Sequence, residues 1–150
     1  MWHRDLALLY TVERNPPLRV VAVGWLGCLT FRLGATPTRF RELLDELCRR
    51  PPASTATPSF HPCRLGCCLW RWMLGRPFFA GSAEIIVPGR DGKVYRAPTL
   101  IGHYVRSHRY RPPREFVEAV LALHGPGGLR WDLIERLTGG GQTSQSMFTL

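Results

Sequence analysis

The sequence contains no apolar run long enough to cross a membrane as a helix. The longest such run, from Val20 to Phe31, lies between Arg19 and Arg32, and it is shorter than the ~18 residues that a helical span requires. A secretory signal peptide is also not indicated, because Asp5 and Glu13 interrupt the N-terminal apolar stretch. We therefore expect a cytoplasmic protein without membrane contact, in a compartment where thiols stay reduced.

Lysine is almost absent, since 19 of the 20 basic residues are arginine and only Lys93 is lysine. With 11 acidic residues, the net charge is +9. Together with the many alanines, glycines and prolines, this bias is typical of a GC-rich bacterial genome. It is weaker evidence that arginine was selected to bind phosphate or carboxylate groups. Residues 1–75 and 76–150 are about equally basic, so composition alone indicates no concentrated basic stripe.

The length of 150 residues and the 45% hydrophobic content are typical of one globular domain. Short Val- and Leu-rich runs at 6–12 and 18–26 predict two strands, and Asp91-Gly92 predicts a hairpin turn. Thr36 is the expected N-cap of the first helix, with Pro37 at its first helical position. The predicted fold class is α+β. It comprises a small antiparallel sheet with a hairpin at 83–96, helices at 37–50, 98–108 and 113–124, a short helix at 131–137, and a zinc-knuckle loop at 61–68.

An aromatic cluster follows the knuckle loop, and we expect its side chains to lie in the core. It comprises the aromatic residues Trp70, Trp72, Phe78 and Phe79 together with Met73.

The predicted domain covers residues 1–137, and residues 138–150 are predicted to form a flexible tail. Uncharged polar residues and three consecutive glycines give the tail no apolar periodicity. Deleting residues 139–150 should therefore change the free energy of unfolding by less than about 0.5 kcal/mol. Thermal unfolding of the truncated chain measures this change. A fall of several degrees in the melting temperature would show that Met147 and Phe148 dock on the domain.

The five cysteines are an odd number, and three of them lie within the six residues 63–68. This pattern argues against a disulfide framework and indicates metal binding or thiol reactivity. Cys28 and Cys48 stand alone in apolar surroundings, so we expect them to be buried thiols.

Two pairs of potential zinc ligands have suitable spacing. Cys63 and Cys67 are separated by three residues, while His103 and His108 are separated by four. Five positions correspond to about 140° around an ideal helix, so both histidines can bind one ion only if the helix ends near His108. Alternative ligands are His61 and Cys68, and the sequence leaves the choice between them open. In the competing interpretation these cysteines are buried thiols and the histidines serve no common site.

The sequence lacks the motifs of three common classes of enzyme site. A nucleobase deaminase needs an upstream His-x-Glu and a Pro-Cys-x-x-Cys, and neither occurs here. A phosphate-binding loop ending in Lys-Ser/Thr and a Gly-x-Ser-x-Gly elbow are also absent from the sequence. The sequence therefore favours a non-enzymatic protein, and a metal- or Cys-dependent enzyme ranks third among its possible functions.

Four arginines within nine residues could contact phosphate groups: Arg106, Arg109, Arg111 and Arg114. The competing interpretation is a solvated helix end that complements the helix dipole. Glu115 and Glu118 stand beside the cluster and would repel a phosphate backbone. We therefore expect a macromolecular partner and favour a protein over a nucleic acid. Nucleic-acid binding through the Arg106–Arg114 surface ranks second among the possible functions.

The chain from about residue 8 to residue 124 resembles a family of small uncharacterised bacterial proteins. The resemblance is carried by Gly81-Ser82-Ala83-Glu84-Ile85, Asp91-Gly92, Ala97-Pro98-Thr99-Leu100-Ile101, His103-Tyr104-Val105, His108, Tyr110 and Pro112-Pro113-Arg114-Glu115-Phe116. Members of that family carry a His-x-Cys-x-x-Cys knuckle, which His61 and Cys63 would match. Here the knuckle has one additional residue, and Arg109 occupies a position where glycine is common. The resemblance implies a fold and a knuckle but no reaction.

The function predicted from the sequence is a non-enzymatic, zinc-stabilised bacterial cytoplasmic interaction module.

Overall fold

The computed structural model describes residues 3–26, 31–56, 61–65, 70–71, 73–75 and 80–138. Its helices are α1 (Thr38–Arg49), the short 3-10 helix η1 (Ala53–Thr55), α3 (Ile101–Ser107), α4 (Arg114–Ala122) and α5 (Trp131–Thr138). Its strands are β1 (Leu8–Val12), β2 (Leu18–Ala22), β3 (His61–Pro62), β4 (Ala80–Gly81), β5 (Glu84–Pro88), β6 (Lys93–Pro98), β7 (His124–Gly125) and β8 (Gly128–Leu129). None of the helices formed by these residues is both long and apolar enough to cross a membrane.

The main sheet has the strand order β1-β2-β6-β5 and is mixed rather than purely antiparallel. β1 pairs antiparallel with β2, and β5 pairs antiparallel with β6, so both form the hairpins that the sequence predicts. β2 and β6 instead run parallel, with Val21 opposite Tyr95. A parallel pair needs a long crossover, and here the chain between the two strands includes α1 and the knuckle region. The fold class is α+β, as expected from the sequence.

The turn between β5 and β6 has the backbone conformation that its sequence predicts. Asp91 and Gly92 both have positive φ values, of 54° and 68°, which is the requirement of a two-residue turn that follows the right-handed twist of the strands. At Gly92 a Cβ atom would lie only 2.7 Å from the carbonyl oxygen of Pro17. Glycine at this position therefore also allows the turn to pack against the β1–β2 connection.

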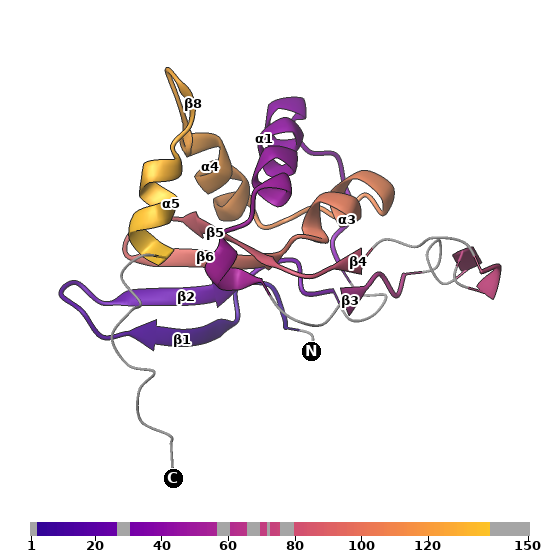
Figure 1. Ribbon diagram of the computed structural model, residues 1–150, viewed down its shortest axis with the longest axis horizontal. Coiled ribbons are helices and arrows are strands. Elements are labelled where there is room, and N and C mark those ends of the chain that lie inside the picture. The colour runs from indigo at the N-terminus through magenta and orange to yellow at the C-terminus, as the bar shows by residue number, and fades with distance from the viewer. Residues whose placement is uncertain are drawn as a thin grey trace, which may run out of the picture.

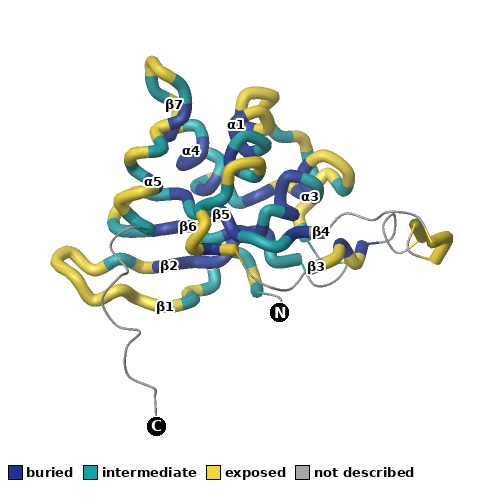
Figure 2. The backbone as a smooth tube through the Cα atoms, in the orientation of Figure 1, coloured by how far each residue is buried: buried dark blue, intermediate teal, exposed yellow. Residues whose placement is uncertain are grey.

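The main helices lie on one side of the sheet and enclose the core (Figure 1). Phe40 of α1 and Phe116 of α4 meet edge to face with ring centroids 6.2 Å apart, and Phe116 meets Tyr95 in the same way at 5.6 Å. Buried residues run through the centre of this layer, whereas β1 at the sheet edge is largely exposed (Figure 2). Burial of these large side chains is the main source of stability for the fold.

Two local expectations were wrong. The N-cap of α1 is Pro37 and the helix begins at Thr38, one residue later than predicted. Trp70 and Met73 are not in the core, because 65% and 66% of their surfaces are exposed. Trp72, Phe78, Phe79 and the tail at 139–150 lie outside the described residues, as does Cys28.

Candidate metal centre

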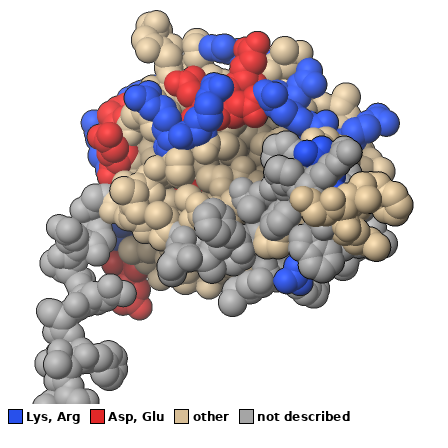
Figure 3. Space-filling view, turned by 45° about the vertical axis from the view of Figure 1, so that its right-hand side comes forward, with Lys and Arg blue, Asp and Glu red and all other residues tan. Residues whose placement is uncertain are grey.

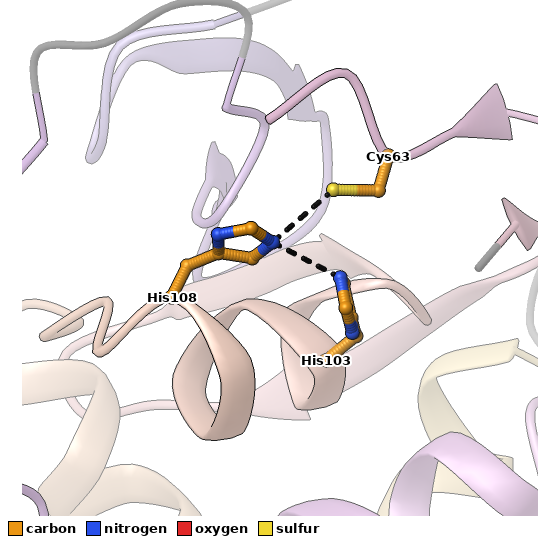
Figure 4. Close-up of side chains that lie close together, drawn as sticks. All are labelled: Cys63, His103 and His108. Carbon is orange, nitrogen blue, oxygen red and sulfur yellow. Dashed lines mark hydrogen bonds between the residues drawn. The ribbon is translucent and has the colours of Figure 1, made fainter. Parts of the chain in front are cut away.

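Three potential metal ligands from two distant parts of the chain converge at the end of α3 (Figure 4). The Sγ atom of Cys63 lies 3.4 Å from Nε2 of His108, which in turn lies 3.1 Å from Nε2 of His103. All three ligand atoms are within 4.8 Å of one another. Three of the four ligands predicted from spacing are therefore neighbours in space, and the fourth, Cys67, lies outside the described residues.

The positions of the ligands follow from their local structure. Cys63 comes directly after β3, which pairs with β4, and only 4% of its surface is exposed. His103 lies on α3, and His108 is the C-cap residue just after that helix ends. Because the helix stops at Ser107, the His108 ring can turn back to lie 4.9 Å from the His103 ring. This confirms the expectation that the helix ends near His108.

Two of the separations between these atoms are close to those of a tetrahedral zinc site. With Zn–N bonds of about 2.05 Å and Zn–S bonds of about 2.3 Å, tetrahedral ligands are separated by ~3.3 Å for two nitrogens and ~3.6 Å for nitrogen and sulfur. The observed distances of 3.1 Å and 3.4 Å are close to these values. One imidazole nitrogen carries either a single proton or a single lone pair. Nε2 of His108 therefore cannot form a full hydrogen bond with both neighbours, whereas an ion between them would satisfy all three.

Burial keeps both histidines neutral, which is the form that binds a metal. It lowers the pKa of His103 to about 4, with a further contribution from the nearby His108. Burial also lowers the pKa of His108. The site therefore needs no proton release from these two rings before a metal ion enters at neutral pH.

The fourth ligand is not identified by the described residues. Cys67 and Cys68 lie outside them. The backbone of His61 forms part of β3. The other free thiol, Cys48, lies on α1 and does not belong to the cluster. Burial raises the Cys48 pKa to about 12, so this thiol is protonated and inert at neutral pH.

The turn after His108 is held by a buried tyrosine. Tyr110 is fully buried, and its amide donates a hydrogen bond to the Tyr104 carbonyl at 3.1 Å. Its hydroxyl donates to the Asp5 carboxylate, with distances of 2.9 and 2.8 Å to the two oxygens. Asp5 also accepts a hydrogen bond from the Gly24 amide at 2.9 Å. The sequence analysis missed Asp5, because nothing in its neighbourhood indicates a partner more than 100 residues away.

Arg109 lies between His108 and Tyr110 in the left-handed backbone region, with φ of 54°. A non-glycine residue in this region costs roughly 1–2 kcal/mol, and helices commonly end with glycine at this point. Arg109→Gly should therefore raise the free energy of unfolding by about 0.5–1 kcal/mol. Chemical denaturation measures the change, with Arg109→Ala as the control because it removes the side chain and keeps the strain. Equal stability of the two variants would contradict this explanation.

The four arginines of the predicted phosphate cluster have different surroundings. Arg106 forms an ion pair with Asp45 of α1. Arg114 forms one with Glu118, at 2.7 Å. Arg109 and Arg111 are exposed, and no ion pair to either is present among the described residues.

A cavity of about 550 Å³ borders His103 between α1 and α3. Among the described residues that line it, Asp45 is the only carboxylate, and it is paired with Arg106. A hydrolytic metal site usually needs a base near the metal-bound water. The described part of this cavity does not provide a free carboxylate for that purpose.

Comparison with known proteins identifies a family but no activity. The profile of the family described as Domain of unknown function (DUF7919) matches residues 1–121 of the chain. No curated protein and no solved structure matches the chain. The matched segment includes Cys63, His103 and His108.

Proposed function

We propose that the chain, which belongs to the family described as Domain of unknown function (DUF7919), is a zinc-stabilised, non-enzymatic protein that binds a macromolecular partner. The observation that carries the proposal is the convergence of Cys63, His103 and His108 within 4.8 Å. Two segments about forty residues apart in sequence supply these ligands. An ion bound to all three would join the knuckle region to the end of α3.

Zinc is the metal that suits this set of ligands best. One thiolate and two imidazoles are the ligands of many tetrahedral zinc sites, whereas magnesium and calcium prefer oxygen. A structural site is closed by a fourth protein ligand. We assign that role to Cys67, with Cys68 and His61 as the alternatives, because the Cys63–Cys67 spacing is one that zinc-binding pairs tolerate. Thiolate ligands persist in the reducing bacterial cytoplasm, which is the location we propose.

Exposed apolar side chains support the assignment as an interaction module. Trp70, Met73 and Leu74 are 65%, 66% and 55% exposed, at the i, i+3 and i+4 spacing of one helical face. Leu8 and Tyr10 on the edge strand β1 are 59% and 46% exposed. Apolar side chains grouped at the surface often mark sites of protein interaction. Their presence supports a protein that acts by binding.

Substitution of zinc by cobalt tests whether the metal site is closed. The absorption spectrum of Co²⁺ depends on its coordination number and on its thiolate ligands. A structural site with four protein ligands should give a tetrahedral spectrum that added azide does not change. If azide altered the spectrum, the ion would have an open position, and the enzymatic alternative would replace the proposal.

A further inference from the structure

An arginine from a distant segment joins the surface beside the metal centre. Leu33 and Tyr110 form an antiparallel bridge. The Gly34 amide donates a hydrogen bond to the Arg109 carbonyl at 3.0 Å, and the Arg111 amide donates one to the Arg32 carbonyl at 2.8 Å. In an antiparallel pair of this register, Arg32 lies directly opposite Arg111. Arg32 lies far from the other arginines in sequence, so sequence analysis could not include it.

Like charges in directly opposite positions destabilise a strand pair. Arg32 and Arg111 are both exposed, and within the described residues neither has an ion-pair partner. Gly34 provides space for the Arg111 side chain, because a Cβ atom there would lie 2.8 Å from its Cδ atom. Two exposed arginines therefore occupy directly opposite positions, and neither is ion-paired with a described carboxylate, which is an arrangement that a bound anion would stabilise.

Arg109 is exposed and lies opposite Gly34 in the same strand pairing, so it adds a third positive charge to this segment. It directly follows the ligand His108, and its own backbone is strained, with φ of 54°. Strain of this kind is often retained at functional positions. We propose that Arg32, Arg109 and Arg111, here named the arginine triad, bind the phosphate backbone of a nucleic acid.

The acidic residues expected to repel a phosphate backbone are engaged elsewhere. Glu118 pairs with Arg114 at 2.7 Å. Glu115 accepts hydrogen bonds from Lys93 at 2.6 Å and from the Tyr95 hydroxyl at 2.9 Å, and the Lys93 bond in particular lowers its pKa. Over the upper part of the face in Figure 3, acidic groups lie among basic ones, whereas toward its right-hand side only basic groups are visible. These contacts remove the objection that Glu115 and Glu118 would repel a phosphate backbone.

The chemistry of the triad suits phosphate in particular. A guanidinium group offers a planar fork of donors that matches two phosphate oxygens. Three such groups on two paired segments offer several donors to phosphate oxygens, and the net charge of +9 favours the approach of a polyanion. This inference rests on the proposed function as an interaction module, because it names the partner of that module.

Binding of short fluorescein-labelled DNA to the full-length, zinc-containing protein tests the triad. Affinity should fall as salt rises from 50 to 200 mM, because each phosphate contact releases condensed counterions. Removing two contacts in Arg32→Gln/Arg111→Gln should reduce the log–log salt slope by about 1.8 on duplex DNA and about 1.4 on single strands. Affinity at the lowest salt should also fall by about tenfold or more. The matched control is Arg14→Gln/Arg90→Gln, which removes the same charge at exposed positions outside the triad and should retain the wild-type slope.

Three outcomes would overturn the inference: no binding by the wild type at low salt, an equal loss of slope in the control variant, or competition by polyglutamate as strong as that by unlabelled DNA. The last outcome would indicate an acidic protein partner instead. If the double variant fails to fold, Arg32→Gln alone should reduce the duplex slope by about 0.9. Zinc content is measured on the same samples. If the wild type, purified without chelator, were folded and free of zinc but bound DNA through the triad, only the metal assignment would be refuted. Triad-independent binding by zinc-containing protein would refute only this inference.

Discussion

Purified without chelator, the protein should contain about one zinc ion per chain, and Cys63→Ser or His103→Ala should each abolish zinc binding. The ligand atoms of Cys63, His103 and His108 lie within 4.8 Å of one another, which is close enough for all three to bind a single ion. Removing one ligand leaves an open and weakened site, so the variants should lose the ion during purification. Elemental analysis of each purified protein gives the zinc-to-chain ratio.

Cys48→Ser is the matched control for this experiment. Cys48 is a free cysteine that lies outside the cluster, so its replacement should leave the zinc content unchanged. Cys67→Ser and Cys68→Ser identify the fourth ligand, since only replacement of the true ligand should release the ion. A well-folded wild-type protein without zinc would disprove the metal centre.

Removing the ion should also lower the stability of the protein substantially. A ligand that binds only the folded state at about 1,000 times its dissociation constant stabilises that state by ~4 kcal/mol. Cys63 is part of the core, but most core side chains are apolar residues of the sheet and the helices that are not ligands, so we expect the zinc-free chain to remain folded with a lower melting temperature. Thermal unfolding with and without a chelator measures the difference. An unchanged melting temperature after confirmed loss of zinc would show that the ion does not stabilise the fold.

The sequence predicted most of the secondary structure because local signals set it. Asp91-Gly92 predicts a turn with two positive φ values, and the apolar spacing from Phe40 to Leu47 predicts the buried face of α1. The parallel pairing of β2 with β6 was not predictable. It depends on contacts between strands that are about seventy residues apart, and the apolar pattern of a short strand does not indicate which other strand it pairs with.

The metal centre was predictable in part for a similar reason. The spacing of His103 and His108, with a helix end between them, could be read from the local sequence. Whether Cys63 reaches them depends on how the knuckle packs against α3, which only the structure shows. The arginine surface was less predictable. Asp45, which neutralises Arg106, and Arg32, which lies opposite Arg111, are both far from the Arg106–Arg114 segment in sequence.

Asp5→Ala should lower the free energy of unfolding by about 2–4 kcal/mol. The Asp5 carboxylate accepts hydrogen bonds from the Tyr110 hydroxyl and from the Gly24 amide. Hydrogen bonds to a charged group contribute about 1.5–3 kcal/mol, and the variant leaves a buried hydroxyl without this acceptor. Burial and the adjacent carboxylate both raise the pKa of Tyr110, so its hydroxyl is protonated and can donate at neutral pH. For a chain of this length, the loss corresponds to a fall of roughly 4–16 °C in the melting temperature.

Asp5→Asn is the control, because its amide oxygen can still accept a hydrogen bond from Tyr110. It should retain more than half of the stability that Asp5→Ala loses. A double-mutant cycle with Tyr110→Phe isolates the interaction, and a coupling energy of about 1–3 kcal/mol is expected for residues in direct contact. A coupling near zero would mean that Asp5 stabilises the protein through Gly24 alone. The Tyr110 contact holds the turn that carries His108, so Asp5→Ala should also weaken zinc binding, although Asp5 touches no ligand.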